Sequence, residues 1–505
     1  MSREKNIYIT IVFNLFLQVV SFSYKFLITP FLLNVWGSLK YGEWLVLFSF
    51  VSSISLLNFG IAKFYGNNLR KAFIEKNFIY YKENIFEALA IGIVIFILSV
   101  ALILFLLTTS NLNELLNIHN WSENEINLTI FFLSMSIIGM IFLEIVLYLF
   151  VSIGKYSYKP MIEAFNLLLQ IILIMILSTQ NVGMVAISAV IFFSVLIVTL
   201  ISAVKFFLTH PDLIPTKLSF NINNFKNNIF NSSYFQLITF SQFLILQGSI
   251  LIISNQIGAA SVTLFVIMRT ITSSLGRQLT HIVNHGIWPE LTTLFAEMNY
   301  PKVVILHHML TQVSYLLISI FSIFILLFID NIFNIWLSTQ EYLDYDITLL
   351  FLIYLTILHT WIPSSFLLMA NNHVKGLGIL TFLGSIFFII LCFLFSNNYG
   401  LEGVLWAMII SDLIILTTAV PRLASNDSHE SIQMFYIQMI KALVPLGLIF
   451  LIFYLYGMSY IVNSGIIIKL AFFVIASLLV GLYYWFFSFS QYEKQYIYKK
   501  IKPRK

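Results

Sequence analysis

The sequence predicts an all-α integral membrane protein with about fourteen transmembrane helices. Composition is the first reason, because 59% of the 505 residues are hydrophobic and only 10% are charged, whereas about a quarter of a soluble globular chain is charged. The second reason is a series of apolar stretches about 18 to 28 residues long, since a helix of about 20 residues crosses a bilayer. The third is the distribution of basic residues, which gather on alternate connections.

Each predicted helix is an apolar run bounded by polar or turn-forming residues. Pro30 lies inside the first run and loosens that helix locally, because it removes one backbone donor. Taken in order, the predicted helices are 7–35, 43–65, 86–108, 128–153, 160–179, 182–207, 230–254, 257–282, 303–329, 347–370, 376–396, 399–420, 437–457 and 463–488.

The charge pattern predicts that both termini are cytoplasmic. With the N-terminus inside, most of the 27 lysines and arginines lie in inner segments, as the positive-inside rule requires. The outer connections 109–127 and 330–346 are acidic instead, and this alternation would fail if one helix were missing. The first run is too long for the apolar core of a signal peptide, and no cleavage site follows it, so we expect it to stay attached.

Similar stretches recur about 220 residues apart, which predicts an internal duplication and two pseudo-symmetric six-helix lobes. A helix–glycine–helix pattern surrounds both Gly37 and Gly258, and residues 181–184 and 398–401 each open an apolar helix. The basic C-terminal tail, residues 491–505, is expected to lie on anionic lipid headgroups. The predicted parts are an N-terminal lobe at 1–210, a C-terminal lobe at 211–425, a C-terminal helix pair at 426–490 and a cytoplasmic tail at 491–505.

Two cations lie deep inside apolar helices. Lys25 lies in the first helix, and Arg269 lies about 18 Å into a helix entered from the outside. A mid-membrane charge costs a few kcal/mol, so it normally faces the protein interior or a hydrated cavity. Snorkelling or a structural ion pair is the alternative, and it is stronger for Lys25. Because the two cations occupy equivalent hairpins of the two lobes, we expect them to face one another across a cavity that attracts an anion.

Other polar side chains within the helices are weaker candidates. Glu144 and Asp412 could each take a coupling proton or sodium ion, or could instead form a structural salt bridge or interhelical hydrogen bond. Lys63, at the inner end of the second helix, is either a snorkelling anchor or part of an inward-facing vestibule. His281 and His285 have metal-ligand spacing but lack an apparent third ligand, so an interfacial structural role is favoured and no metal site is predicted.

Motifs of soluble enzymes are absent from the sequence. We find no P-loop, no GxSxG and no HExxH, so no cofactor is predicted, and uphill transport must draw on an ion gradient, a partner or removal of the substrate. The single cysteine, Cys392, excludes an intramolecular disulfide framework. The net charge of +5 is explained by the inner basic loops and needs no nucleic-acid partner.

Three short motifs near the N-terminus carry a family resemblance. Tyr-Gly-Glu-Trp at 41–44, Leu-Leu-Asn-Phe-Gly-Ile at 56–61 and Gly-Asn-Asn at 66–68 follow a proline-containing first helix. In this the chain resembles the Wzx-type O-antigen and polysaccharide flippases, which share a superfamily with multidrug and toxin extrusion transporters and lipid II flippases. The resemblance covers essentially the whole chain.

The resemblance implies translocation of an undecaprenyl-pyrophosphate-linked oligosaccharide, an O-antigen or capsule repeat unit, across the bacterial cytoplasmic membrane. In related lipid II flippases, cations of the first and eighth helices line the central cavity, and Lys25 and Arg269 are similarly placed. These two cations would neutralise the pyrophosphate inside the cavity while the polyprenyl tail stays in lipid. The lobes would move the substrate across the membrane by alternating access. Membrane lipids, a polysaccharide polymerase and chain-length proteins are the implied partners. Sugar selection would fall to polar side chains such as Asn14, Gln18, Gln242 and Gln247.

Two alternative functions stay open at this point. The first is a cation-coupled multidrug exporter of the same fold, which typically places carboxylates in the lobe cavities, whereas the first and seventh predicted helices here have none. The second is a membrane polysaccharide polymerase or ligase, which would be favoured by a long outer loop. The longest connection here is only about twenty residues, which disfavours that class.

Overall fold

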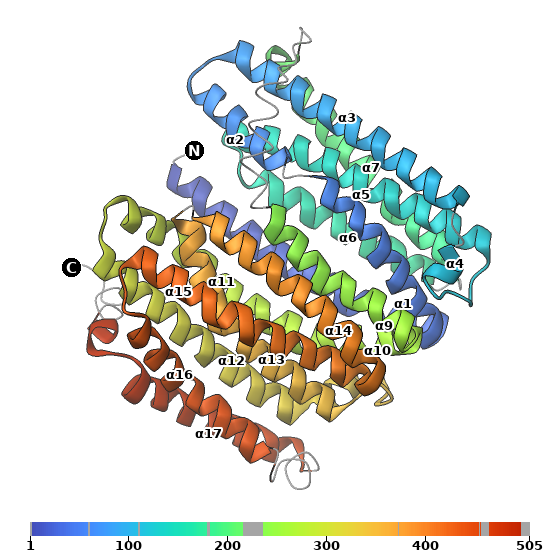
Figure 1. The fold of residues 1–505 in the computed structure, drawn as a ribbon. Coiled ribbons are helices and arrows are strands. Elements are labelled where there is room, and N and C mark those ends of the chain that lie inside the picture. Colours follow the sequence, from blue (N-terminus) through green and yellow to red (C-terminus); the bar gives the residue numbers. More distant parts are fainter. Residues whose placement is uncertain are drawn as a thin grey trace. The chain divides into compact units, whose positions relative to one another are not determined.

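The described residues fold mainly into long helices (Figure 1). The computed structural model describes residues 3–58, 61–109, 112–178, 182–215, 236–371, 373–453, 455 and 464–495. In these residues twelve helices are long and apolar enough to cross a membrane, and no strand occurs. Two of the twelve each join a pair of predicted helices through a glycine with positive φ, Gly37 at +74° and Gly400 at +55°. With these two divided, the twelve match the fourteen predicted spans, and the protein is a multi-pass all-α membrane protein.

Contacts divide the chain into two compact units, residues 1–263 and 264–505, and the boundary falls within α10 (Ala259–Arg269). The four ranges predicted from the sequence stay a prediction. In unit 1, α5 is the central helix, because α2, α3, α6 and α7 all pack against it. Unit 1 contains α1 (Arg3–Ser52), α2 (Ile61–Ile74), α3 (Phe78–Thr109), α4 (Leu112–Leu115), α5 (Glu123–Ser152), α6 (Tyr158–Ser178), α7 (Met184–Thr209), a helix at 236–243, the π-helical turn η3 (Leu244–Gly248) and α9 (Ser249–Gln256).

In unit 2 the two central helices are α12 and α13. They pack on each other, and between them they contact α11, α14, α15, α16 and α17. The elements of unit 2 are the π-helical turn η4 (Thr270–Ser274), α11 (Leu275–Ala296), α12 (Tyr300–Trp336), α13 (Tyr345–Ala370), α14 (Val374–Ser411), the π-helical turn η5 (Asp412–Leu416), α15 (Thr417–Ser428), α16 (Ile432–Ile452), α17 (Ile466–Tyr483) and the π-helical turn η7 (Tyr484–Ser488).

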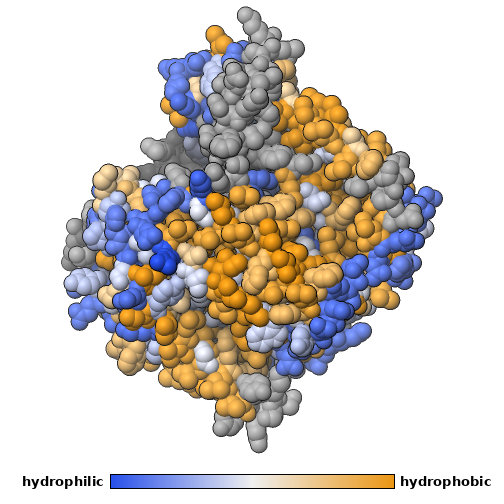
Figure 2. Space-filling model, in the orientation of Figure 1, coloured by the Kyte–Doolittle hydropathy of each residue, from blue (hydrophilic) through white to orange (hydrophobic). Residues whose placement is uncertain are grey.

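Large apolar side chains remain exposed along the helices, as expected of a surface that faces lipid rather than water. On α17, Ile467, Leu478 and Leu482 are examples, and most of this helix is exposed. Figure 2 shows apolar residues covering most of the visible surface, with hydrophilic residues gathered in separate areas. Many small polar residues are buried instead, and hydroxyls such as those of Ser49 and Thr272 donate to carbonyls four residues earlier in their own helix.

The Tyr-Gly-Glu-Trp motif at 41–44 has a structural role in unit 1. The Tyr41 hydroxyl shares a hydrogen bond of 3.2 Å with the Thr29 hydroxyl, and the ring of Trp44 lies 5.6 Å from that of Trp36. A Cβ atom at Gly42 would lie 1.9 Å from the Ala259 carbonyl oxygen, so only glycine lets α1 approach the start of α10 this closely. The motif therefore fastens the second half of α1 to its neighbours.

Glu43 completes this arrangement by binding the connection that precedes α5. The residue is 1% exposed, and its carboxylate accepts hydrogen bonds from the backbone N–H groups of His119 (2.8 Å) and Asn120 (3.1 Å), and from the Asn120 side-chain amide (2.8 Å). A buried carboxylate that accepts these hydrogen bonds orders the turn at 119–120.

Replacing Glu43 by glutamine is expected to lower the free energy of unfolding by about 2 kcal/mol, because the charge is lost and an amide N–H₂ group faces backbone donors. Thermal unfolding of the purified protein in detergent measures this. Glu402→Gln, which changes a residue at the surface of α14, is the control and should leave the midpoint unchanged. Equal stability of Glu43→Gln and the parent would contradict a structural role for the carboxylate.

Candidate functional site

Arg269 is the last residue of α10, and it is followed directly by the π-helical turn η4. Its guanidinium lies 5.3 Å from the centre of the Phe265 ring, and the residue is half-buried. An arginine resting on an aromatic face loses less on leaving water than one surrounded by aliphatic groups. The ring thus helps to stabilise a cation within a membrane-spanning helix.

A second arginine, Arg277, joins Arg269 because of the π-helical turn. Eight residues of a straight α-helix would rotate Arg277 about 80° away from Arg269. A π turn holds one residue more than an α turn, so passing through η4 reduces this difference to about 20°. The Arg277 Nη2 atom donates to the Ser273 hydroxyl inside that turn at 3.2 Å, and the charges of the two arginines act on each other.

Asp412 is the acidic member of the same cluster. It begins the second π-helical turn, η5, and is 3% exposed. Its carboxylate accepts a hydrogen bond of 3.1 Å from the Trp361 indole of α13 and lies within electrostatic range of Arg277. Tyr354 lies about two turns before Trp361 on α13. Its hydroxyl group interacts electrostatically with Arg269, Arg277 and Asp412. The structure thus brings two of the sequence-predicted residues, Arg269 and Asp412, into one polar cluster.

The backbone that follows Asp412 is irregular, and another helix satisfies it. Pro421 has no N–H group to offer the Thr417 carbonyl one turn earlier. The Tyr436 hydroxyl of α16 donates to that carbonyl at 3.1 Å and also contacts the Thr418 carbonyl at 3.0 Å. The Thr417 side chain in turn shares a hydrogen bond of 2.6 Å with Thr360 of α13. These contacts hold the π-helical turn at Asp412 against α13.

His359 has a structural position in unit 2. The residue is fully buried, its Nε2 atom lies 2.7 Å from the Thr280 hydroxyl of α11, and its Nδ1 atom lies 2.7 Å from the Leu355 carbonyl. The Nε2 atom therefore links α13 to α11, and the Nδ1 atom is satisfied by the backbone of α13 itself. The side chains of His281 and His285 lie outside the described residues, and among those described no group of three or more His, Cys, Asp or Glu side chains could hold a metal ion.

The remaining sequence-predicted residues lie in unit 1. Lys25 is exposed on α1, and its carbonyl accepts a hydrogen bond of 2.8 Å from the Thr29 hydroxyl. Lys63 lies on α2, but its side chain is outside the described residues. Glu144 forms an ion pair of 3.6 Å with Lys159, whose ammonium also lies 4.3 Å from the Tyr148 ring. For Glu144 this geometry favours the structural salt bridge over the coupling role.

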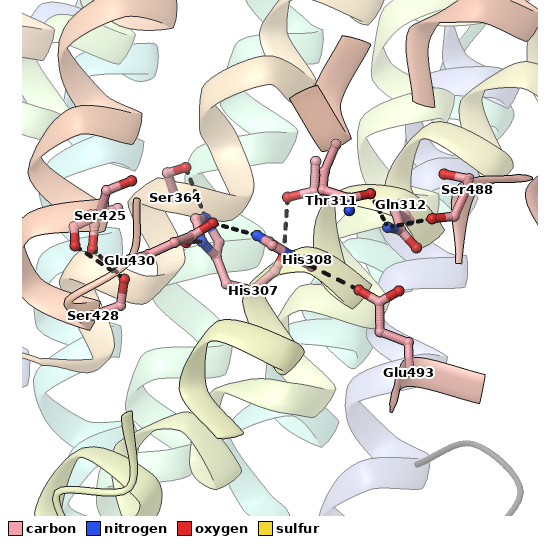
Figure 3. A network of polar contacts seen from close by, with 12 residues as sticks. His307, His308, Thr311, Gln312, Ser364, Ser425, Ser428, Glu430, Ser488 and Glu493 are labelled. Atoms are coloured by element: carbon pink, nitrogen blue, oxygen red, sulfur yellow. Dashed lines mark hydrogen bonds and ion pairs between the residues drawn. The ribbon is translucent and has the colours of Figure 1, made fainter. Parts of the chain in front are cut away.

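Sequence reasoning missed a buried network at the start of α12 (Figure 3). His307 and His308 both contact Glu430, which lies in the turn between α15 and α16, and His308 also faces Glu493 near the C-terminus. Burial alone would raise the pKa of Glu430, but hydrogen bonds from the two histidines outweigh it and lower this pKa to about 2. The signal available in the sequence was the His-His pair, which is unusual in a membrane-spanning run.

Comparison with known proteins gives no match to a family model and no match among curated proteins. Solved structures do match. An inward-facing multidrug resistance MATE family transporter of the MOP superfamily has a TM-score of 0.66 at 14% identity, covering 81% of this chain and 96% of that one. The MATE multidrug transporter DinF-BH has a TM-score of 0.61 at 16% identity, with coverages of 85% and 98%.

The lipid II flippase MurJ, in an inward closed conformation, matches over more of the chain. Its TM-score is 0.62 at 13% identity, and the match covers 93% of this chain and 98% of that one. Identities this low show the arrangement of helices and leave the substrate open. The chain has the fold that these MATE multidrug transporters share with the lipid II flippase.

Proposed function

We propose that the protein is a flippase that moves an undecaprenyl-pyrophosphate-linked oligosaccharide, an O-antigen or capsule repeat unit, across the bacterial cytoplasmic membrane by alternating access. It acts as a transporter, with a lipid-linked anion as its substrate. The fold shared with the lipid II flippase supports the class of transported molecule, because that protein too is named for a lipid-linked substrate.

The observation that carries the proposal is the pair Arg269 and Arg277 on one face of a membrane-spanning helix. Arg269 lies in the middle of the span Ala259–Thr280, where a guanidinium group is costly unless it faces a partner, a ligand or a hydrated cavity, and Arg277 lies near the end of the same span. Guanidinium groups bind phosphate oxygens through charge-assisted, often bidentate hydrogen bonds, and a diphosphate offers enough oxygens for both. Together with Asp412, the cluster carries one net positive charge when the carboxylate is ionised.

The other cations extend this proposal. Lys25, in the predicted first helix, supplies a further positive charge to the diphosphate, and Lys63 belongs to the vestibule through which the headgroup enters. Lys25 is an exposed residue of α1. Glu144 has the weaker case for ion coupling, because it is ion-paired with Lys159.

Asp412 is the proposed coupling residue, since a proton there raises the net charge of the cluster from one to two. Replacing Asp412 by asparagine, which fixes the neutral form, is expected to tighten binding of inorganic pyrophosphate by up to about tenfold, because unit charges roughly 10 Å apart interact by about 1–2 kcal/mol at an effective dielectric of 20. Isothermal titration of the purified protein measures this. Asp427→Asn, in the same unit, is the control, and unchanged affinity in Asp412→Asn would remove this aspartate from the coupling proposal.

The test of the function is the appearance of lipid-linked glycan on the outer face of cells that lack this protein. We expect deletion to trap the glycan on the inner face, and expect the parent protein to restore its exposure while well-expressed Lys25→Ala or Arg269→Ala does not. Normal exposure of the glycan in the deletion strain would contradict the proposal.

A cation-coupled multidrug exporter is the second candidate, favoured by the likeness to two multidrug transporters. The two functions separate in one further measurement. An exporter would raise the resistance of cells to cationic drugs and would lose that activity when Asp412 or Glu144 is neutralised, while the flippase would leave resistance unchanged.

A further inference from the structure

Four buried titratable side chains meet where α12 begins. His307 and His308 are neighbours on α12, Glu430 lies in the turn between α15 and α16, and Glu493 belongs to the C-terminal segment, which is defined here as residues 490–495. Their side chains are only 0%, 13%, 3% and 2% exposed, respectively. Figure 3 shows Glu430 and Glu493 reaching His308 from opposite sides. One histidine therefore connects three separate parts of unit 2.

The contacts of His307 are satisfied by a neutral ring. Its Nδ1 atom lies 3.2 Å from a Glu430 oxygen and donates to it, while its Nε2 atom lies 3.0 Å from the Ser364 hydroxyl of α13, which can donate in return. The ring also stacks on Phe435 of α16, with 4.9 Å between ring centres and 8° between planes. A second proton on His307 is not needed by any of these partners.

The contacts of His308 favour a charged ring. Its Nε2 atom is hydrogen-bonded to the Oε1 atom of Glu430, and its Nδ1 atom lies 3.9 Å from the Oε1 atom of Glu493. An ionised carboxylate can only accept hydrogen bonds, so the Glu430 contact needs a proton on Nε2, while the 3.9 Å contact with Glu493 is an ion pair that favours a positive charge on the ring. A neutral His308 would turn a lone pair toward one of the two carboxylates.

Glu493 also organises its own segment. Its Oε2 atom accepts a hydrogen bond of 2.5 Å from the Ser490 backbone N–H, and the Ser490 hydroxyl accepts one of 3.4 Å from the Glu493 N–H. This is a capping box, which starts the short helix at 491–495. One carboxylate thus both begins the helix and attaches it to α12 through His308.

The surroundings leave His308 as the group that responds to pH. The charged groups that act on it are Glu430 and Glu493. From the other elements packed here, α13 presents the Ser364 hydroxyl, α16 presents the Phe435 ring, and the Ser488 carbonyl of η7 accepts from Gln312 at 3.1 Å. With its pKa near 2, Glu430 stays ionised over the physiological range. Histidine is the side chain that ordinarily exchanges a proton within that range.

We propose that His308 is a proton-binding site that fastens the C-terminal segment to α12. With the proton bound, one imidazolium bridges Glu430 and Glu493. As the pH rises and the proton leaves, two buried carboxylates flank a neutral ring, and Glu493 regains water by moving away from α12. The attachment is therefore present at acidic and neutral pH and is lost as the pH rises. It is independent of which substrate is transported.

Hydrogen–deuterium exchange of the purified full-length protein in detergent tests this proposal, with rates corrected for the intrinsic effect of pH. In the parent protein, the amides of the C-terminal segment should exchange at least about tenfold more slowly near pH 6 than near pH 8.5, since a charge-assisted contact is lost. His308→Gln and Glu493→Gln should exchange fast at both values. The second variant keeps the test usable if His308→Gln folds poorly.

His373→Gln is the matched control. His373 also pairs with a carboxylate, that of Asp427 at 2.7 Å, but its side chain is 55% exposed and this partner does not belong to the C-terminal segment. This variant should keep the parent's dependence on pH. The proposal is overturned if the parent segment is equally protected at both pH values, or if His308→Gln retains the full pH dependence.

Discussion

Alanine in place of Gly42 is expected to lower the free energy of unfolding by more than about 3 kcal/mol, and to reduce accumulation of the protein in the membrane. The added methyl carbon would lie 1.9 Å from the Ala259 carbonyl oxygen and 3.0 Å from the Thr263 hydroxyl. Because the nearest atom belongs to the backbone of another helix, no rotation of a side chain relieves the overlap. The Thr263 hydroxyl also donates to the Ser38 carbonyl at 2.7 Å, and this bond would be strained as α1 and α10 separate.

Thermal unfolding in detergent and the yield of monodisperse protein measure the effect of Gly42→Ala. Gly447→Ala is the matched control, because Gly447 also lies within a helix but has open space where a Cβ would stand. The control should be neutral or stabilising by about 1 kcal/mol, since alanine favours helix more than glycine does. Similar midpoints for the two variants would show that α1 and α10 do not approach as closely as described.

Glutamine in place of Arg269 is expected to weaken the binding of a polyprenyl diphosphate by about 10- to 100-fold. One charge-assisted contact to phosphate is typically lost at a cost of about 1.5–3 kcal/mol. Arg269 is half-buried and glutamine is a comparably good helix former, so the folded protein should keep most of its stability. Loss of affinity without loss of stability is the result that distinguishes a binding residue from a structural one.

The measurement is binding of the purified variant to a fluorescent polyprenyl diphosphate, compared with the corresponding polyprenol, which lacks the phosphates. Arg422→Gln is the control, because Arg422 is exposed on α15 of the same unit. It should bind like the parent. If Arg269→Gln and Arg422→Gln both bind the diphosphate as the parent does, Arg269 is not part of the binding site.

Hydropathy predicted the helices well, because a membrane forces each spanning segment to be long, apolar and internally hydrogen-bonded. Gly37 and Gly258 were identified as turns, and both adopt positive φ, +74° and +114°. Arg269 and Asp412 stood out for a related reason, since any charge in such a run is conspicuous. These features depend only on neighbouring residues, so they can be predicted directly from the sequence.

Arg277 was missed because its relation to Arg269 depends on a π-helical turn that composition does not reveal. The network around His308 was missed because its members lie far apart in the chain. His308 and Glu430 are separated by 122 residues, and Glu43 is separated from Asn120 by 77. When residues are this far apart along the chain, tertiary packing alone decides which of the many polar side chains come into contact.

The hydroxyl of Tyr436 stands in for an N–H group that Pro421 cannot supply to the Thr417 carbonyl. The effects of substitutions at the two positions are therefore expected to depend on each other. With a non-proline residue at 421, the helix would satisfy that carbonyl itself, and phenylalanine at 436 would be tolerated. With proline at 421, loss of the tyrosine hydroxyl removes this donor from the carbonyl, so the two substitutions are expected to be accepted in one order and not in the other.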